Sequence, residues 1–158
     1  MKSTPHLSAS RLSTYQACLL EARAHRVLVG RFRSWLKEFG LNSNEWAILG
    51  ALTDHAAEGM RLSQISTLLH LHAPQGTSMV TSLEQRGLVV RKAEDLDARS
   101  RRAHLTKEGK KLVEKAERQL RGQMRDYLRD VSRPALDTYL GVLDYLANQE
   151  TSPSDGSV

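Results

Sequence analysis

The sequence predicts a mainly α-helical protein with one small β-hairpin, and two observations indicate this fold class. Apolar residues recur at steps of three and four over two long segments, residues 11–38 and 106–131, which is the spacing of an amphipathic helix. A short β-branched run at residues 88–92 is followed by a highly charged stretch and then by a second short segment at 102–105. That pattern is typical of two strands joined by a polar turn.

The N-terminal half is expected to hold two helices. The first covers residues 11–38 and is expected to stop at Gly40, because glycine tolerates the left-handed backbone that ends a helix. The second begins after Asn42, whose side chain can cap it, and Glu45 stands three residues later as in a capping box. Gly59 is expected to end that unit.

Two short helices come next, and then the hairpin. Ser63 is expected to cap the first short helix, and Pro74 suits the first position of the second, which runs to about residue 86. We expect residues 93–101 to form the tip of the hairpin, because they show no apolar periodicity.

The C-terminal part is expected to hold two more helices. Thr106 is a candidate cap for a helix to about Val131, and Pro134 begins a final helix that runs to about residue 149. In the whole chain, two short helices joined by a turn are thus followed by a hairpin, which is the order of a winged helix-turn-helix domain. In that arrangement the second short helix enters a major groove of DNA, and the hairpin tip can reach the adjacent minor groove.

Composition limits the classes of protein that need to be considered. The chain has 158 residues, enough for one domain with extensions, and no run of eighteen apolar residues that would span a membrane. The N-terminal residues lack the apolar segment of a secretory signal, and the single cysteine, Cys18, excludes an intramolecular disulfide. We therefore expect a soluble, cytoplasmic protein without a membrane partner.

The positive charge is concentrated in the middle of the chain. The formal net charge is +5, and residues 60–111 carry ten basic and five acidic side chains. A local basic surface attracts phosphate groups and releases counterions when it binds nucleic acid. The competing interpretation is that the charge only keeps the protein in solution.

The charged hairpin supplies the most specific feature of the sequence. Arg99, Arg101 and Arg102 would place guanidinium groups, which suit a narrow minor groove, near the tip. Asp97 precedes Arg99 by two residues and can bond both the turn backbone and the guanidinium. The acids would then orient the basic residues. The alternative is a solvated turn with incidental ion pairs.

The same stretch, "DLDARSRRAHLTKEGKKL", resembles the wing signature of the MarR family of transcriptional regulators. The positions that match this signature are Asp97, Arg99, Arg102, Leu105, Thr106, Glu108 and Gly109. Upstream, "SLEQRGLVVRK" is similar to the family's end of recognition helix and first wing strand, and "LNSNEWAILGAL" is similar to its second helix. Element order agrees over residues 11–147, and the motifs agree over residues 63–109.

The resemblance implies a homodimer that binds double-stranded DNA. Each protomer would present one winged helix to half of a pseudo-palindromic operator, and the regulator would most often act as a repressor. Apolar stripes on the terminal helices, too extensive for a small winged helix to cover, agree with a dimer. The implied organisation is a flexible N-terminus (1–10), dimerisation helices (11–40 and 107–148), a DNA-binding domain (41–106) and a disordered tail (149–158).

The predicted recognition helix departs from the family in its charge. It holds no basic residue before Arg86; Ser78 stands where relatives often have Arg, and Gly76 where they usually have a β-branched residue. A glycine inside a helix costs about 1 kcal/mol relative to alanine. The candidate DNA contacts outside the hairpin are therefore small and neutral: Ser63, Gln75, Thr77, Ser78, Thr81 and Ser82.

Family members often release DNA when a small molecule, frequently an aromatic acid, binds near the dimerisation helices. Arg23 and Arg26 are candidates to pair with a carboxylate, and Trp46 is a candidate to stack on a ring. Surface ion pairs for the arginines and a core position for the tryptophan are the competing interpretations.

Cys18 raises a second way of sensing, because it resembles in position the reactive cysteine of OhrR-type peroxide sensors. Ala22 and Phe32 stand where tyrosine hydroxyls would be needed to hold a thiolate, so a packed core thiol is the favoured interpretation. His70 and His72 are two residues apart and would point apart on a helix, so no metal site is expected.

Other classes of function find less support. The chain has no phosphate-binding loop, dinucleotide fingerprint, nucleophile elbow or zinc-protease motif, so neither an enzyme nor a cofactor is expected. A winged helix can also bind RNA or serve as a protein-interaction module. Salt-dependent binding to a short DNA duplex would separate these alternatives.

Overall fold

A computed structural model describes residues 13–94 and 97–149 of the chain, without the side chains of residues 94–100. The end segments expected to be flexible, residues 1–10 and the tail after residue 149, lie outside this range. The chain forms two compact units, Met1–Leu120 and Arg121–Val158, and each is described by itself below.

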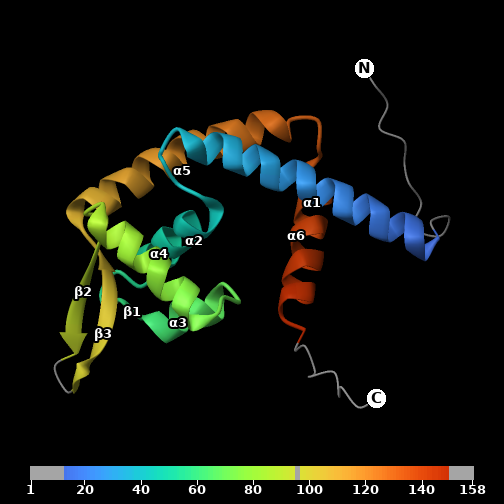
Figure 1. Cartoon of the computed structure of the whole chain (residues 1–158). Coiled ribbons are helices and arrows are strands. Elements are labelled where there is room, and N and C mark those ends of the chain that lie inside the picture. The colour runs from blue at the N-terminus through green and yellow to red at the C-terminus, as the bar shows by residue number, and fades with distance from the viewer. Residues whose placement is uncertain (1–12, 95–96, 150–158) are drawn as a thin grey trace, which may run out of the picture. The chain divides into compact units, whose positions relative to one another are not determined.

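The protein is mainly helical with a small antiparallel sheet, which confirms the predicted fold class (Figure 1). Its elements in chain order are α1 (Thr14–Lys37), α2 (Ser43–Asp54), β1 (Met60–Arg61), α3 (Leu62–Leu68), α4 (Ala73–Gln85), β2 (Val89–Glu94), β3 (Asp97–Leu105), α5 (Lys107–Tyr127) and α6 (Arg133–Ala147).

The structure confirms the predicted start of α2 and corrects the predicted start of α3. The Asn42 side chain accepts a hydrogen bond from the Glu45 N–H (2.9 Å), and the Asn42 N–H donates to Glu45 Oε2 (3.0 Å), which confirms the capping box of α2. The expected cap at Ser63 is wrong, because α3 already begins at Leu62. Gln64 satisfies the first turn instead, by accepting from the Arg61 N–H at 2.8 Å.

The sheet has one strand more than the sequence predicts. β3 pairs with both β1 and β2, in the order β1-β3-β2. The two-residue strand β1 is too short to produce a periodic signal, and it forms only because it meets the middle of β3. The hairpin strands are also longer than expected, since Ala93 pairs with Arg101 and Glu94 with Asp97 across a register shift.

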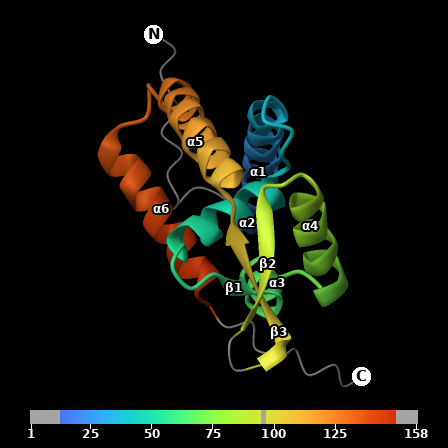
Figure 2. The ribbon, with the colours of Figure 1, turned by 90° about the vertical axis from the view of Figure 1, so that its left-hand side faces the viewer.

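The core of the first unit lies where α2, α3 and α4 meet the sheet and the ends of α1 and α5. Its fully buried large side chains are Leu36, Ile48, Leu49, Leu52, Ile65, Val80, Leu83 and Val89. Figure 2 shows α4 beside the strand pair β2–β3, which extends away from the helices. The core therefore fixes α4 and the base of the wing together.

Gly76 has a packing role that its helical position did not suggest. A Cβ atom at this residue would lie 2.2 Å from Ser66 Oγ and 3.4 Å from Ser66 Cβ. Ser66 is buried on α3, so the missing side chain lets α3 and α4 approach closely. The helix-propensity cost of glycine is offset here by the contact between the two helices.

Thr106 and Gly109 join the wing to α5. The Thr106 hydroxyl accepts from the Gly109 N–H (3.0 Å), which confirms Thr106 as the cap, and it donates to the Gly87 carbonyl (2.7 Å). The Leu88 carbonyl accepts from the Thr106 N–H at 3.1 Å. A Cβ atom at Gly109 would stand only 2.1 Å from that carbonyl oxygen, so only glycine fits.

The second unit contains the end of α5 and the whole of α6. α5 ends at Tyr127, four residues before the expected Val131, and Ser132 caps α6 through the Ala135 N–H (3.4 Å). No residue of α6 is buried. The apolar residues exposed on it are Tyr139, Leu140, Val142, Leu143, Tyr145 and Leu146.

No helix within residues 13–94 and 97–149 combines the length and the apolar composition that a membrane span requires.

Candidate nucleic-acid interface

One face of α4 is turned away from the core and carries no charge. The opposite face is buried through Gly76, Val80 and Leu83. We call the outward residues the neutral stripe; they are Pro74, Thr77, Ser78, Thr81 and Gln85. Thr77 and Ser78, both predicted contacts, are exposed on it, and Thr81 is half-buried beside them.

The two other predicted contacts on α4 are already engaged. Gln75 is exposed at the edge of the stripe, where its Oε1 accepts from the His72 N–H at 3.3 Å. The Ser82 hydroxyl lies 3.5 Å from Glu45 Oε1, on the side that faces α2. Ser82 is therefore directed into the protein, whereas Gln85, which sequence reasoning missed, lies on the stripe four residues after Thr81.

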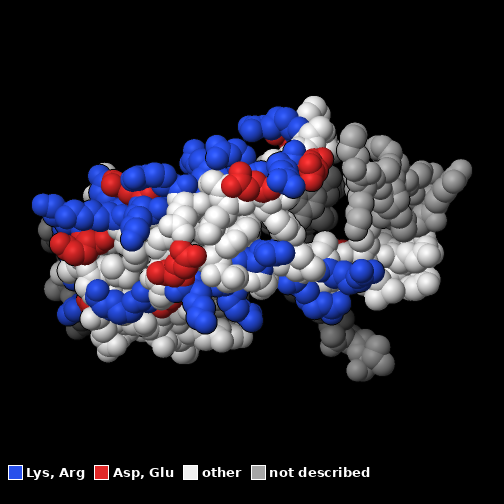
Figure 3. Space-filling view, turned by 90° about the horizontal axis from the view of Figure 1, so that it is seen from above, with Lys and Arg blue, Asp and Glu red and all other residues white. Residues whose placement is uncertain are grey.

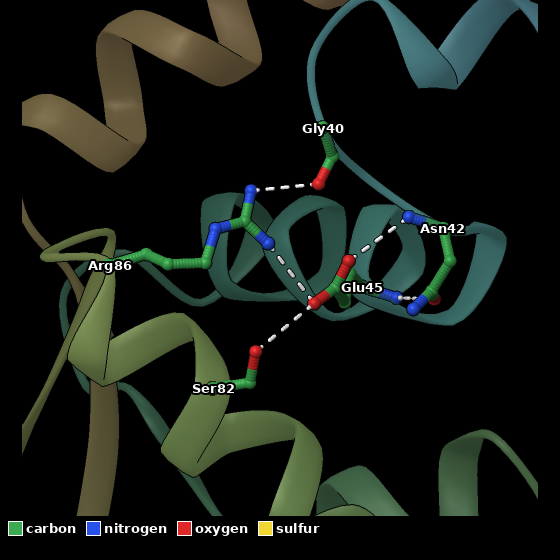
Figure 4. A network of polar contacts seen from close by, with 5 residues as sticks. All are labelled: Gly40, Asn42, Glu45, Ser82 and Arg86. Carbon is green, nitrogen blue, oxygen red and sulfur yellow. Dashed lines mark hydrogen bonds and ion pairs between the residues drawn. The ribbon is translucent and has the colours of Figure 1, made fainter.

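Arg86, at the end of α4, is held by the body of the domain (Figure 4). Its Nη1 donates to Glu45 Oε1 at 3.1 Å, and its Nη2 donates to the Gly40 carbonyl at 2.9 Å. The same carboxylate closes the capping box with Asn42 through its other oxygen. We call these five residues, Gly40, Asn42, Glu45, Ser82 and Arg86, the Glu45 network.

A second ion pair connects α4 to the wing. Glu84 Oε1 accepts from the Arg91 N–H (3.2 Å), and Glu84 Oε2 accepts from Arg91 Nε (2.8 Å) and is also paired with Nη2. The hydrogen bond from the Arg91 side chain lowers the pKa of Glu84 below its usual value. Arg91 lies on β2, so this pair sets the wing against the end of α4.

The Glu84–Arg91 pair predicts a pH dependence of stability. A carboxyl whose pKa is lowered by folding stabilises the protein above its unfolded pKa, and the contribution is lost as pH falls through the folded pKa. We expect wild type to be more stable than Glu84→Gln at pH 7, and the difference between them to shrink at pH 3. Urea unfolding of both proteins at the two pH values measures it; an unchanged difference would contradict the role of the charge.

The predicted wing residues differ in what the structure can place. The side chains of Asp97 and Arg99 lie outside the described residues, so the predicted brace between them stays a prediction. Arg101 is exposed on β3. Arg102 is half-buried, and its Nη1 donates to the Gly59 carbonyl at 3.1 Å, so part of its guanidinium holds the turn before β1.

Three cations lie in one row across the sheet. Arg102 is paired in register with Arg61 on β1 and with Lys92 on β2, and directly paired residues share a face. Burial, together with the charges of Lys92 and Arg102, lowers the pKa of His104. The sheet thus supplies positive charge beside α4, which has none on its stripe.

The remaining positive charge of the middle segment lies elsewhere. Lys107, Lys110 and Lys111 are exposed on α5, which begins after the wing. Figure 3, a view from above Figure 1, shows many Lys and Arg side chains on that face with Asp and Glu between them. The bulk charge of residues 60–111 therefore does not describe the surface around α4.

The residues proposed for effector binding do not gather around one hollow in the described first unit. Arg23 and Arg26 are exposed on α1, about 15 to 20 Å along the helix from Leu36, where α1 enters the core. Trp46 is partly buried against that core. A hollow of about 460 Å³ lies instead between α2, β1 and α3, lined by His55, Met60, Ser63, Gln64, Thr67 and Leu68.

The expectation of a packed thiol at Cys18 is wrong for the chain by itself, because Cys18 is exposed on α1. The α1 stripe on which it lies is not covered by the first unit: Tyr15, Leu19 and Leu20 are exposed as well. Within the described part of the chain, no group of three His, Cys, Asp or Glu side chains is placed to hold a metal ion.

Comparison with known proteins agrees with the winged arrangement. The model of the MarR family matches residues 39–100, which run from the turn before α2 into the wing. Over these residues the chain is similar to the MarR family. The Glu84–Arg91 pair and the neutral stripe thus lie in the part of the chain that matches the family model.

Two curated relatives illustrate the likeness. The HTH-type transcriptional regulator Hpr of Exiguobacterium sibiricum is 33% identical over 82 residues, which are 52% of this chain and 42% of that protein. The organic hydroperoxide resistance transcriptional regulator of Bacillus subtilis is 29% identical over 101 residues, 64% of this chain and 67% of that protein. The chain spans 42% to 67% of the lengths of these relatives. Both are named as regulators and not as enzymes, in line with the expectation from the motifs.

Solved structures share the fold over most of the chain. A MarR-family regulator from Rhodococcus sp. RHA1 has a TM-score of 0.76 and 22% identity, covering 87% of this chain and 96% of that one. CouR from Rhodococcus jostii RHA1, bound to p-coumaroyl-CoA, has a TM-score of 0.72 and 24% identity, covering 84% of this chain and 92% of that one. A MepR variant from S. aureus, bound to an oligodeoxyribonucleotide, has a TM-score of 0.59 and 20% identity over 86% and 97%.

Proposed function

We propose that this protein is a homodimeric, MarR-type transcriptional regulator that binds a pseudo-palindromic DNA operator and acts as a repressor. The observation that carries the proposal is the exposed face of α4 beside a wing with three cations in one row. An outward helix fits a major groove, and a cationic hairpin fits the adjacent phosphates and minor groove. The MepR variant bound to an oligodeoxyribonucleotide supports it by analogy of fold. A DNA partner also implies a cytoplasmic location.

The test is selection of DNA by the purified protein. We expect it to retain a small set of genomic fragments, and a duplex made from their shared sequence to bind with an affinity that falls steeply with salt. Binding to RNA alone, or to no duplex at low ionic strength, would contradict the proposal and favour an RNA-binding or protein-interaction module. The genes next to the retained fragments would suggest what is regulated.

The wing yields a prediction of its own. Arg101→Ala is expected to weaken binding to most duplexes, because phosphate and minor-groove contacts distinguish few sequences. The slope of log K against log salt should become shallower by about 0.9, the value for one lost phosphate contact. Fluorescence anisotropy at several salt concentrations measures both quantities.

The matched control for the wing is Arg118→Ala, which removes an exposed arginine of α5 instead. This variant should bind DNA as wild type does, with the same salt slope. Equal effects of the two variants would show that net charge, and not the wing, determines affinity.

Dimerisation is proposed from the apolar surface that the described residues leave uncovered. α6 exposes six large apolar side chains, and α1 exposes Tyr15, Leu19, Leu20 and Val27. Exposed apolar patches of this kind mark protein interfaces. A second copy of the chain is the occupant that a pseudo-palindromic operator requires.

A small-molecule effector is the proposed signal. The CouR structure holds p-coumaroyl-CoA, which makes an aromatic ligand the first class to test here. A carboxylate is the group that the arginines of α1 would bind. Arg23, Arg26 and Trp46 remain the candidate contacts. Titration of aromatic carboxylates into the protein–DNA complex should release the DNA for at least one compound, since an effector must bind the DNA-free geometry better.

Oxidation of Cys18 is the second candidate signal, and its exposure favours it over the packed thiol expected from sequence. The likeness to an organic hydroperoxide resistance regulator points the same way. If the thiol is the sensor, hydroperoxide should release wild-type protein from DNA and leave Cys18→Ser bound. Equal responses of the two proteins would end this candidate.

A further inference from the structure

The solvent-facing side of α4 is uncharged, although charged residues stand at the end of the helix. The neutral stripe offers the ring of Pro74, the hydroxyl of Ser78, the amide of Gln85 and two threonines. The Thr81 hydroxyl donates to the Thr77 carbonyl at 2.9 Å. Since the proton of that hydroxyl is used by the helix backbone, Thr81 can offer a partner its methyl group and a hydroxyl oxygen that only accepts.

Both charged residues at the end of α4 are committed to the protein itself. Arg86 bridges Glu45 and the Gly40 carbonyl at 3.1 and 2.9 Å, and Glu84 is paired with Arg91 on β2. These pairs join α4 to the α1–α2 turn on one side and to the wing on the other. They fix the angle of the helix and give both charges a partner within the protein. Figure 4 shows Arg86 with its partners.

Direct reading of bases depends on which groups a helix can offer. Guanine is read by the two donors of Arg or by Lys, and the cytosine amino group by a carboxylate; the stripe has neither. Thymine presents a methyl group to apolar contacts such as threonine methyls, and adenine pairs its N6 and N7 edge with a carboxamide. Pro74, Thr77, Thr81 and Gln85 supply those groups.

We propose that α4 recognises A·T base pairs, thymine methyl groups above all, through the neutral stripe, and that Arg86 is a positioning residue and not a DNA contact. The proposal rests on the proposed DNA-binding function and names the class of base pair that this function reads. In this arrangement the ionic part of the affinity comes from the sheet and the wing, and α4 contributes specificity.

The first test uses wild-type protein and modified DNA. In the duplex selected by the protein, each thymine of the half-sites is replaced in turn by deoxyuridine, which lacks only the C5 methyl group. At contacted positions affinity should fall about fourfold per methyl, the factor for burying one such group. The same replacement outside the half-sites is the control and should change nothing.

This test also separates the two levels of the proposal. Wild-type protein that binds no duplex would refute the proposed function itself. Protein that binds a duplex whose half-sites are rich in G·C pairs, or that does not respond to deoxyuridine, would refute only the reading of A·T pairs.

The second test concerns the Glu45 network. It predicts opposite changes in DNA affinity for the two possible roles of Arg86, which are to position α4 or to contact phosphate. Glu45→Gln keeps the size of the side chain but removes the charge that holds Arg86. If Arg86 positions α4, affinity should fall at least tenfold; if Arg86 contacts phosphate, release from Glu45 should raise affinity. Arg86→Gln should also weaken binding at least tenfold.

The salt slope decides between the roles for Arg86→Gln. A positioning role leaves the slope of log K against log salt as in wild type, whereas loss of a phosphate contact makes it shallower by about 0.9. Circular dichroism and sedimentation are used to confirm fold and dimer for both variants. Tighter binding by Glu45→Gln, or the shallower slope for Arg86→Gln, would overturn the positioning role. If a variant does not fold, the deoxyuridine experiment still tests the reading of A·T pairs, because it uses wild-type protein.

Discussion

Leu143→Glu is expected to convert the protein to a monomer and to weaken operator binding by about two to four orders of magnitude. Leu143 lies on the apolar side of α6 and is 43% exposed, with no core of its own to enter. A buried, unpaired carboxylate at an interface costs far more than the lost leucine contact. A monomer also loses the gain in effective concentration that two linked half-site contacts provide. Sedimentation and DNA titration measure the two effects.

The control for Leu143→Glu lies next to it on the same helix. Asp144→Lys changes the charge by two units on the polar side of α6, where the side chain is exposed. It should remain dimeric and bind DNA as wild type does. A Leu143→Glu protein that stays dimeric would show that α6 is not the dimerisation surface.

Gly109→Ala is expected to lower the free energy of unfolding by about 3 kcal/mol, at the upper end for overpacking. The added Cβ would lie 2.1 Å from the Leu88 carbonyl oxygen and 3.0 Å from its carbon. These are backbone atoms, and the same oxygen already accepts from the Thr106 N–H, so the backbone at Leu88 cannot move aside without losing that bond. Urea unfolding monitored by circular dichroism measures the change.

Gly50→Ala is the matched control for Gly109→Ala. Gly50 also lies inside a helix, but a Cβ there would meet nothing within 4 Å. This substitution should stabilise the protein by up to about 1 kcal/mol, the difference in helix propensity. If both variants lose the same stability, the carbonyl contact of Gly109 is not the cause.

In the candidate interface on α4, the sequence predicts which residues share a helix face but not which side chains are engaged by distant parts of the chain. Helical periodicity settles which residues share a face, and the candidate contacts Thr77 and Ser78 are both exposed on the outer face of α4. Periodicity does not settle the direction of Ser82, because its hydroxyl faces Glu45, thirty-seven residues away along the chain. Arg86 reads in the sequence as a cation at the end of a recognition helix, yet its partners come from the α1–α2 turn.

The fold divides in the same way. Local patterns were enough for the helices, the capping residues Asn42 and Thr106 and the hairpin, because caps and periodicity act between residues three or four apart. Local patterns did not predict β1, which exists only through its pairing with β3. They also did not explain why residues 76 and 109 are glycines, because the atoms that a Cβ would meet lie elsewhere in the chain.

The sequence by itself determined the element order, the family motif of the wing and the outer face of α4, since each depends on neighbours along the chain. Only the tertiary structure decided which charges remain available to a partner. Ion pairs such as Glu45–Arg86 and Glu84–Arg91 form between elements that the fold brings together, and the geometry of those elements, not the count of charged residues, determines whether a guanidinium faces DNA or the protein.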